Sequence, residues 1–250
     1  MDGIRVSARD LWVGYRVKSA RGLPLHGQRS WALRGVDLSV APGEVVGIVG
    51  GNGSGKTTFL RTIVGVLTPG KGSLEVSGKV GGLVELRPDA DRDLSVRERM
   101  VMSGVLLGFR RRDSKLLAGL ARDFGELDPA VLNAPVYTLS TGMLLRLEMS
   151  LLLNADCDVL AVDELLMGAD ADFRSRCLDR IGVICAGGGS AVLSSHDPLL
   201  LSRCDRILRL EAGLLRTEAR SPGSDGGPEG DPGDEPPTRN LANLPPDTST

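Results

Sequence analysis

The stretch that decides the fold is GGNGSGKT, at residues 50–57. It matches the phosphate-loop pattern G-x-x-x-x-G-K-[ST], and it lies between the apolar run EVVGIVG and a helical pattern. Glycines let successive backbone N–H groups curl around phosphate oxygens, and the amino terminus of the following helix adds a positive dipole. A chance glycine-rich turn is the alternative. The combination of strand, loop and helix favours a triphosphate site.

Two side chains of this loop have specific expected roles toward ATP. We expect Lys56 to reach the β- and γ-phosphates, and the Thr57 hydroxyl to be a ligand of Mg²⁺. The residues expected to bind the nucleotide here are Gly50, Gly51, Asn52, Gly53, Ser54, Gly55, Lys56, Thr57 and Thr58.

Two later apolar runs, VLAVDE (159–164) and SAVLSSH (190–196), have the continuous pattern of buried parallel strands. Parallel strands linked by helices predict a wound α/β sheet with its ligand at the carboxyl ends of the strands. Asp163 could then hold Mg²⁺, and Glu164 could polarise the attacking water. The alternative for this pair is an acidic strand end before a loop. His196 could sense the γ-phosphate or orient water, although a lone histidine is more often structural.

The rest of the chain surrounds this predicted sheet. A strand near residues 36–40 and a turn at 41–44 suggest an antiparallel β portion, and residues 95–153 are mostly helical, most clearly at 113–124 and 143–153. We predict one P-loop NTPase domain of α/β class over residues 1–217, with a helical subdomain at about 87–155. Residues 218–250 are acidic and rich in Pro and Gly, so we expect a disordered tail.

Charge and composition bear on the expected partners and compartment. A formal net charge of -2 gives no basic footprint, so no nucleic acid partner is expected. The four cysteines are scattered without metal-ligand spacing, which is typical of free thiols in a reducing compartment. No secretory signal and no membrane-spanning apolar run of about 18 residues is visible. We therefore expect a cytoplasmic protein that touches a membrane only through a partner.

One more motif, LSTGM (139–143), precedes an apolar helical pattern. Ser140 is placed to cap that helix, and Gly142 would let the backbone approach an anion at the amino end. A simple helix cap is the alternative.

In their order and spacing, the phosphate loop, LSTGM, the acidic pair and His196 resemble the ATP-binding cassette (ABC) ATPases over roughly residues 4–217. In that family two cassettes sandwich two ATP molecules, and each phosphate loop faces the other subunit's signature loop. The resemblance implies that Ser140 and Gly142 act in trans on the γ-phosphate. It also implies that Glu164 is the general base and His196 the switch residue.

Two aromatic residues have weaker assignments. The resemblance implies that Tyr15 stacks on adenine, although a buried tyrosine in the β portion is an equally good interpretation. Trp31 is another aromatic candidate for this role, although we interpret it as a packing residue.

Residues 30–80 look like the cassettes that export cell-surface polysaccharides, such as O-antigen, capsule, teichoic acid and galactan. The signature is similar to that group's, with Met143 where most cassettes have Gln. The stretch LLMGADADF places Asp170 and Phe173 as in that group, and VELRPDADRDLSVRERM is similar to its leucine-rich segment.

The chain also departs from the family pattern. Most cassettes carry a glutamine that links the Mg²⁺ to the permease, and Glu85 is the nearest polar substitute here. Residues 87–92 lack the group's Gly-x-Gly-Phe, and Ala169 stands where a glycine is usual. The tail is too short and polar to be the carbohydrate-binding domain that some members append, which implies that the permease selects the substrate.

The sequence thus predicts the ATP-hydrolysing subunit of an ABC exporter that moves lipid-linked polysaccharide, with ATP and Mg²⁺ as cofactors. Its expected partners are an integral-membrane permease and a second copy of itself. Export of a drug, lipid or antibiotic is the main alternative. A soluble ABC protein acting on ribosomes or DNA is another alternative, as is a non-hydrolysing scaffold. The scaffold is disfavoured because Lys56, Asp163, Glu164 and His196 are all present.

Overall fold

The structure of the protein, a computed structural model, describes residues 3–18, 24–84, 93–107 and 109–217. The chain divides into two units, Met1–Arg220 and Ser221–Thr250, and the whole second unit lies outside the described residues. The expected disordered tail at 218–250, Glu85 and residues 87–92 lie outside the described residues, so the disorder of the tail and the metal role of Glu85 remain predictions.

A six-stranded sheet forms the centre of the first unit. Its strand order is β5 (Val80–Leu83), β6 (Val159–Val162), β7 (Ser190–Ser194), β3 (Val45–Val49), β8 (Arg206–Glu211) and β9 (Leu214–Thr217). Neighbouring strands from β5 to β8 are parallel, and only β9 runs antiparallel, against β8. Every residue of β3, β6 and β7 is buried. The wound parallel sheet predicted from the continuous apolar runs is confirmed.

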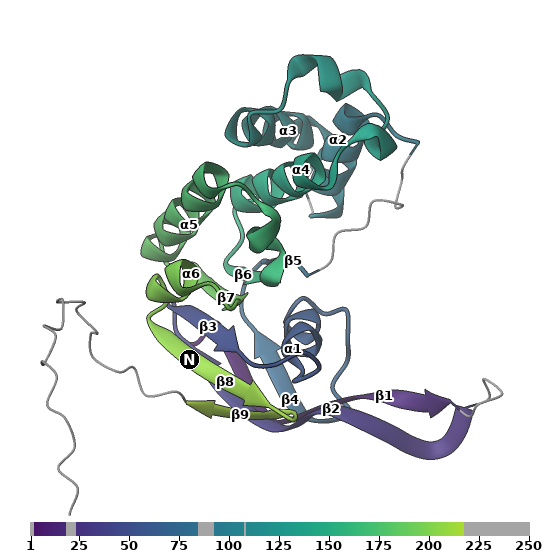
Figure 1. The fold of residues 1–250 in the computed structure, drawn as a ribbon, viewed down its shortest axis with the longest axis vertical. Coiled ribbons are helices and arrows are strands. Elements are labelled where there is room, and N and C mark those ends of the chain that lie inside the picture. The colour runs from purple at the N-terminus through teal and green to yellow at the C-terminus, as the bar shows by residue number, and fades with distance from the viewer. Residues whose placement is uncertain (1–2, 19–23, 85–92, 108, 218–250) are drawn as a thin grey trace, which may run out of the picture. The chain divides into compact units, whose positions relative to one another are not determined.

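A second, antiparallel sheet has the order β2 (Pro24–Val40), β1 (Val6–Lys18) and β4 (Lys71–Val76). Because β1 and β2 are much longer than β4, they continue as a hairpin that projects beyond the rest of the unit (Figure 1). The antiparallel β portion was predicted, but the projecting hairpin was not.

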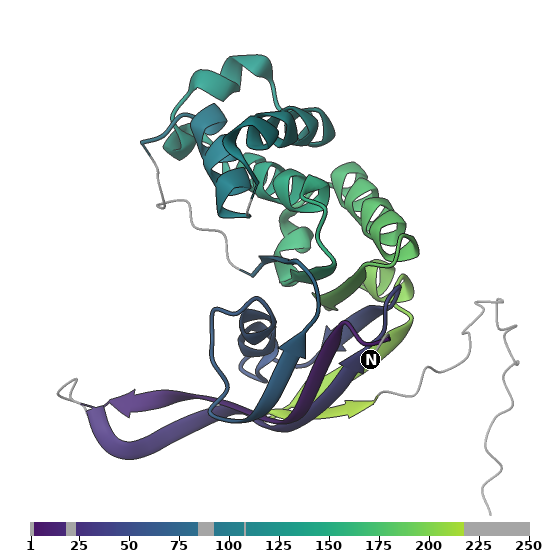
Figure 2. The same cartoon turned by 180° about the vertical axis from the view of Figure 1, so that it is seen from behind.

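Helix α1 (Lys56–Ile63) follows the phosphate loop and packs between the two sheets. Its apolar residues Phe59, Leu60 and Ile63 share one buried cluster with residues of β1, β2, β3 and β8. Helices α5 (Ala171–Ala186) and α6 (Pro198–Ser202) cover the opposite face of the six-stranded sheet, as the view from behind also shows (Figure 2).

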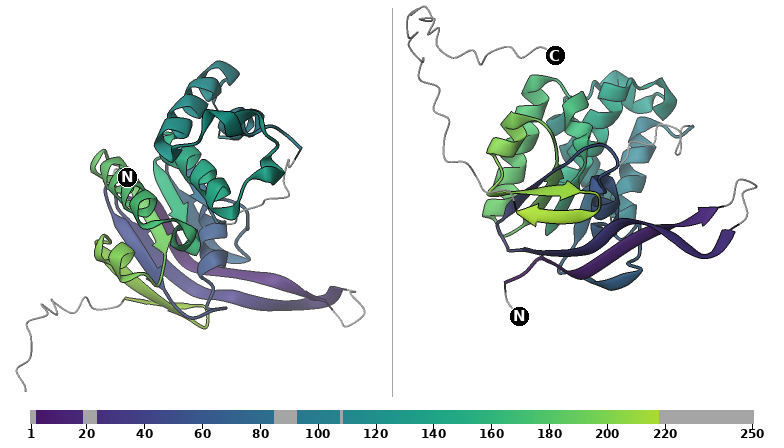
Figure 3. Two further views of the ribbon diagram at one scale, coloured as in Figure 1. Left: turned by 45° about the horizontal axis from the view of Figure 1, so that its top comes forward. Right: turned by 60° about the horizontal axis from the view of Figure 1, so that its bottom comes forward.

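The remaining helices gather at one end of the unit: α2 (Val96–Leu106), α3 (Arg111–Gly125) and α4 (Thr141–Asn154), with the short 3₁₀ helices η1 (Pro129–Asn133) and η2 (Val136–Thr138) between them (Figure 3). The helical patterns at 113–124 and 143–153 correspond to α3 and α4. Helix α4 is buried along most of its length, because it joins this helical group to the sheet through an apolar cluster that also includes α5. Among the described residues, each helix is too short or too polar to cross a bilayer.

The sheet order places three functional segments side by side. The phosphate loop leaves the carboxyl end of β3, Asp163 follows β6, and His196 lies two residues after β7. Since β7 pairs with both β3 and β6, these segments meet at one edge of the sheet.

Candidate nucleotide-binding site

The phosphate loop depends on glycine at two positions. Gly50 has φ 156°, and a Cβ added there would lie 2.2 Å from the Leu210 carbonyl oxygen. Gly55 has φ 114°, and an added Cβ would lie 2.7 Å from the Ala32 carbonyl oxygen. A side chain at either position would therefore be strained and would clash with backbone. The two glycines fix the path of the loop between the sheet and α1.

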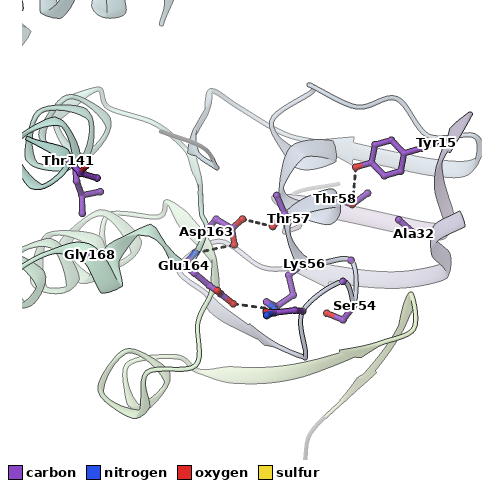
Figure 4. Close-up of a pocket in the computed structure, with 14 residues that line it drawn as sticks. Tyr15, Ala32, Ser54, Lys56, Thr57, Thr58, Thr141, Asp163, Glu164 and Gly168 are labelled. Carbon is purple, nitrogen blue, oxygen red and sulfur yellow. Dashed lines mark hydrogen bonds and ion pairs between the residues drawn. The ribbon is translucent and has the colours of Figure 1, made fainter. Parts of the chain in front are cut away.

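Lys56 lies inside the loop. Its Nζ donates to the carbonyl oxygens of Gly50 at 2.5 Å and Gly51 at 3.3 Å. It also lies 3.2 Å from Glu164 Oε1 (Figure 4). The residue is only 6% exposed. A buried ammonium group surrounded by carbonyl oxygens and one carboxylate is placed to receive phosphate oxygens.

Asp163 is the centre of a polar cluster at the end of β6. Thr57 Oγ1 donates to Asp163 Oδ2 at 2.6 Å, while the Ser194 hydroxyl and the Glu164 backbone N–H both donate to Oδ1. Asp163 itself is buried. The Thr57 hydroxyl and the Asp163 carboxylate are hard oxygen donors of the kind that Mg²⁺ prefers, since this ion is usually held by one or two carboxylates, phosphate oxygens and waters. Among the described residues, no group of three His, Cys, Asp or Glu side chains is arranged to hold a metal ion.

Glu164 and His196 face each other across the same edge. His196 Nε2 lies 3.2 Å from Glu164 Oε1, the same oxygen that approaches Lys56. His196 is not a core histidine, because about half of its side chain (53%) is exposed. Its neighbour Asp197 caps α6 and lies 3.6 Å from Arg174 on α5. These two contacts fix the position of the segment that carries His196.

Lys56, Asp163 and Glu164 open into a cavity of about 620 Å³, which His196 does not line. It is lined by Tyr15, Ala32, Asn52, Gly53, Ser54, Gly55, Lys56, Thr57, Thr58, Thr141, Leu145, Asp163, Glu164 and Gly168. In the close-up, Tyr15 lies beside Thr58, and Thr141 lies at the opposite side of the cavity, beyond Asp163 (Figure 4). The phosphate loop and the acidic strand end thus share one cavity, as the motif order predicts.

Tyr15 is not buried. It is 44% exposed, and its hydroxyl lies 3.0 Å from Thr58 Oγ1 at the start of α1. The interpretation of Tyr15 as a buried tyrosine of the β portion is therefore wrong, and stacking on adenine remains a prediction. Trp31 packs edge-on against Trp12, with ring centroids 5.6 Å apart, which agrees with its interpretation as a packing residue.

The LSTGM segment begins α4. Ser140 is the N-cap, because its hydroxyl accepts the Met143 N–H at 3.2 Å. Gly142 has no positive φ, and a Cβ added there would meet nothing within 4 Å. Nothing in the described part of this chain therefore requires glycine at position 142. Of this segment, Thr141 rather than Ser140 or Gly142 lines the chain's own cavity.

Sequence reasoning missed Thr141, Leu145 and Gly168, which line the cavity, and two further contributors. Ser194 orients the Asp163 carboxylate, and Ala32 on β2 lines the cavity beside the loop. The serine pair in SAVLSSH was a usable signal, because two hydroxyls at the carboxyl end of a buried strand need polar partners. A small apolar residue such as Ala32 leaves no comparable signal.

Comparison with known proteins agrees with this geometry. Residues 33–166 match the family model described as ABC transporter, which is more than half of the chain. The chain therefore belongs to the ABC transporter family, whose ATP-binding cassette has the fold described above.

Relatives of the chain include ATP-binding proteins of O-antigen export systems. The chain is 34% identical over 186 residues to the O-antigen export system ATP-binding protein RfbB of Myxococcus xanthus, a match that spans 74% of this chain but only 42% of that protein. It is 32% identical over 193 residues to the RfbB protein of Klebsiella pneumoniae, covering 77% of this chain and 78% of the relative. A solved dimeric bacterial ABC transporter cassette superposes with a TM-score of 0.73 at 19% identity, covering 85% of this chain and 97% of that one.

Proposed function

We propose that this chain is the ATP-hydrolysing subunit of an ABC exporter and that it works as a pair. The observation that carries the proposal is that Lys56, Asp163 and Glu164 line one cavity at the end of the phosphate loop, with His196 3.2 Å from Glu164. ATP would lie along the loop, with its β- and γ-phosphates at Lys56 and its adenine beside Tyr15. Thr57 and Asp163 would hold Mg²⁺, which neutralises phosphate charge when it is bound.

Glu164 is proposed as the general base that takes a proton from the attacking water. Its Oε1 lies 3.2 Å from both Lys56 Nζ and His196 Nε2, so both partners engage the carboxylate. Phosphate oxygens would compete with Glu164 for the Lys56 ammonium group. Nucleotide binding would thereby release the carboxylate toward the water, while His196 keeps it oriented.

The signature loop is proposed to act on the ATP of a second copy. Gly142 has no neighbour that explains it within the described part of this chain, and a glycine two residues after the Ser140 cap leaves backbone N–H groups open to an anion. The solved cassette dimer provides an arrangement in which two such chains associate. Phosphoryl transfer depends on positioned charges, so a site completed by the partner would hydrolyse ATP only in the closed pair.

The proposed cargo is a lipid-linked cell-surface polysaccharide, moved by an integral-membrane permease. Two relatives are named as ATP-binding proteins of O-antigen export systems, and one is matched over 78% of its length. The chain would then act at the cytoplasmic face of the membrane, bound to the permease. Export of a drug, lipid or antibiotic would use the same ATP chemistry and remains the alternative.

Replacing the proposed base tests the ATPase and the pair together. We expect Glu164→Gln to bind ATP and to form a closed dimer in saturating ATP and Mg²⁺, while steady-state phosphate release is abolished. Asp179→Asn is the control, because Asp179 is an exposed carboxylate on α5 that pairs with Arg203. A Glu164→Gln protein that stays monomeric by light scattering, or that still turns over, would contradict the split site.

The cargo needs a separate test in the native host. Affinity purification in mild detergent should recover a polytopic permease, and depletion of the protein should cause polyprenyl-linked glycan to accumulate. A permease without glycan accumulation would leave the ATPase in place and favour the alternative cargo.

A further inference from the structure

Glu126, directly after α3, has a backbone conformation that glycine adopts more readily than glutamate does. Its φ is 53° and its ψ 41°, which is the left-handed region that glycine occupies most readily. The preceding residue is a glycine, but Gly125 is the last residue of the helix, where a Cβ would lie 2.7 Å from Ser150 Oγ of α4. Glycine is therefore used for the close approach of α3 to α4, and a glutamate occupies the strained position.

The Glu126 carboxylate contacts two arginines from different helices. Arg176 of α5 donates to Oε1, and Arg146 of α4 lies 3.4 Å from Oε2. The hydrogen bond from Arg176 lowers the pKa of the Glu126 carboxyl, which keeps it charged. Both guanidinium groups also lie over the Phe173 ring, at 4.8 Å for Arg146 and 5.7 Å for Arg176.

Arg146 connects this cluster to the segment that follows Asp163 and Glu164. It lies one turn after Gly142 on α4, and its Nη2 donates to Asp170 Oδ2 at 2.6 Å. Asp170 is the N-cap of α5 and ends the segment that begins at Asp163 and Glu164. Its carboxylate is thus shared between the Phe173 N–H and Arg146. The cluster joins the end of α3, the signature helix and the start of α5.

We infer that Glu126 is a positioning residue for ATP hydrolysis. It holds Arg146 and Arg176, and thereby fixes the positions of α5 and the Glu164–Asp170 segment relative to α4. This inference rests on the proposed ATPase function. Glu126 does not touch the nucleotide cavity, so it acts only through the two arginines. Its loss would misplace Glu164 relative to bound ATP without removing any phosphate ligand. Turnover should therefore fall while nucleotide binding is kept.

Three substitutions at this position separate positioning from helix capping. Glu126→Gln removes the charge, Glu126→Gly removes the charge and relieves the backbone strain, and Glu126→Asp keeps a carboxylate. Positioning predicts that kcat for ATP falls about tenfold in the Gln and Gly variants, with an unchanged KM, because small misplacements of catalytic groups are costly. The Asp variant should stay closer to the unchanged protein. A residue that only ends the helix would tolerate glycine best.

The measurement is steady-state ATPase activity of the full chain, with thermal unfolding followed in parallel. Asp179→Asn is the matched control, since it removes an α5 carboxylate whose partner Arg203 is outside the cluster. Wild-type kcat in the Gln and Gly variants, or a change confined to KM, would overturn the inference. If Glu126→Gln does not fold, Glu126→Gly carries the same test, because it removes the charge without straining the backbone; wild-type kcat in that variant would overturn the inference. An unchanged protein without ATPase activity would instead refute the proposed function.

Discussion

Both carboxylate oxygens of Asp163 are in use before any nucleotide is considered. Thr57 contacts Oδ2, and Ser194 and the Glu164 N–H contact Oδ1. Hydrogen bonds to a buried carboxylate fix its rotamer. The side chain that would hold Mg²⁺ is therefore oriented by residues from β7 and α1, and a carboxylate at a strand end alone would lack this orientation.

Gly142→Ala distinguishes a role of Gly142 in the stability of this chain from a role in the proposed ATP-bound dimer. The added methyl meets nothing within 4 Å in this chain, and alanine favours the helix more than glycine does, so the melting temperature should not fall. If Gly142 faces the partner's ATP, hydrolysis should drop sharply and the nucleotide-bound dimer should weaken. The measurement is ATPase activity beside thermal unfolding. Full activity in the alanine variant would contradict the role of Gly142 in trans.

The site residues that a motif carries were predictable, and those that depend on packing were not. Lys56, Asp163, Glu164 and His196 each occupy a recognisable position after a buried strand. Ser194 and Ala32 enter the site only because β7 lies beside β6 and β2 passes near the loop. The exposure of Tyr15 was equally hidden, since it depends on where β1 runs relative to α1.

At the scale of helices, the helical group is held by close approaches at small residues. A Cβ on Gly104 of α2 would lie 2.8 Å from Ser114 Cβ and 3.1 Å from Ser114 Cα on α3. Gly125 of α3 approaches Ser150 of α4 in the same way. The sequence predicted these helices from their apolar spacing, but it gave no indication that glycine–serine pairs set the distances between them.

Gly104→Ala should therefore destabilise the helical group. The new methyl must push α2 and α3 apart, which typically costs about 1–3 kcal/mol of unfolding free energy. Gly119→Ala on α3 is the control: its methyl meets nothing within 4 Å, and helix propensity should stabilise the protein by about 1 kcal/mol. Urea unfolding of both variants should show a lower free energy of unfolding for Gly104→Ala and a higher one for Gly119→Ala. Equal stabilities would mean that α2 and α3 can separate without cost.

Across the whole molecule, the four cysteines are free and buried. Burial raises the pKa of Cys157 and Cys185 to about 11 and that of Cys177 to about 12. Since the thiolate is the reactive form, a raised pKa leaves less of it at any given pH below that value. We expect little labelling by a thiol reagent at pH 8 in the folded protein and four labelled thiols after unfolding. Rapid labelling of the native protein would show that the core opens.

The overall architecture was predictable because continuous apolar runs and the phosphate loop each imply a parallel sheet. The antiparallel edge strand β9 and the long β1–β2 hairpin were not predicted. Both depend on backbone pairing between segments whose composition resembles ordinary surface strands, so the apolar pattern cannot distinguish them.

The position of β3 within the sheet has a consequence for synthesis on the ribosome. This strand delivers the phosphate loop, yet both of its partners come late in the chain, since Val45 pairs with Ala191 and Val46 pairs with Arg206. The nascent chain thus carries an apolar strand with no partner until β7 and β8 have been translated. Ordering the loop requires these distant segments to close on each other, which is slow. A nascent chain stalled before β7 should accordingly remain a chaperone substrate and should not yet retain nucleotide.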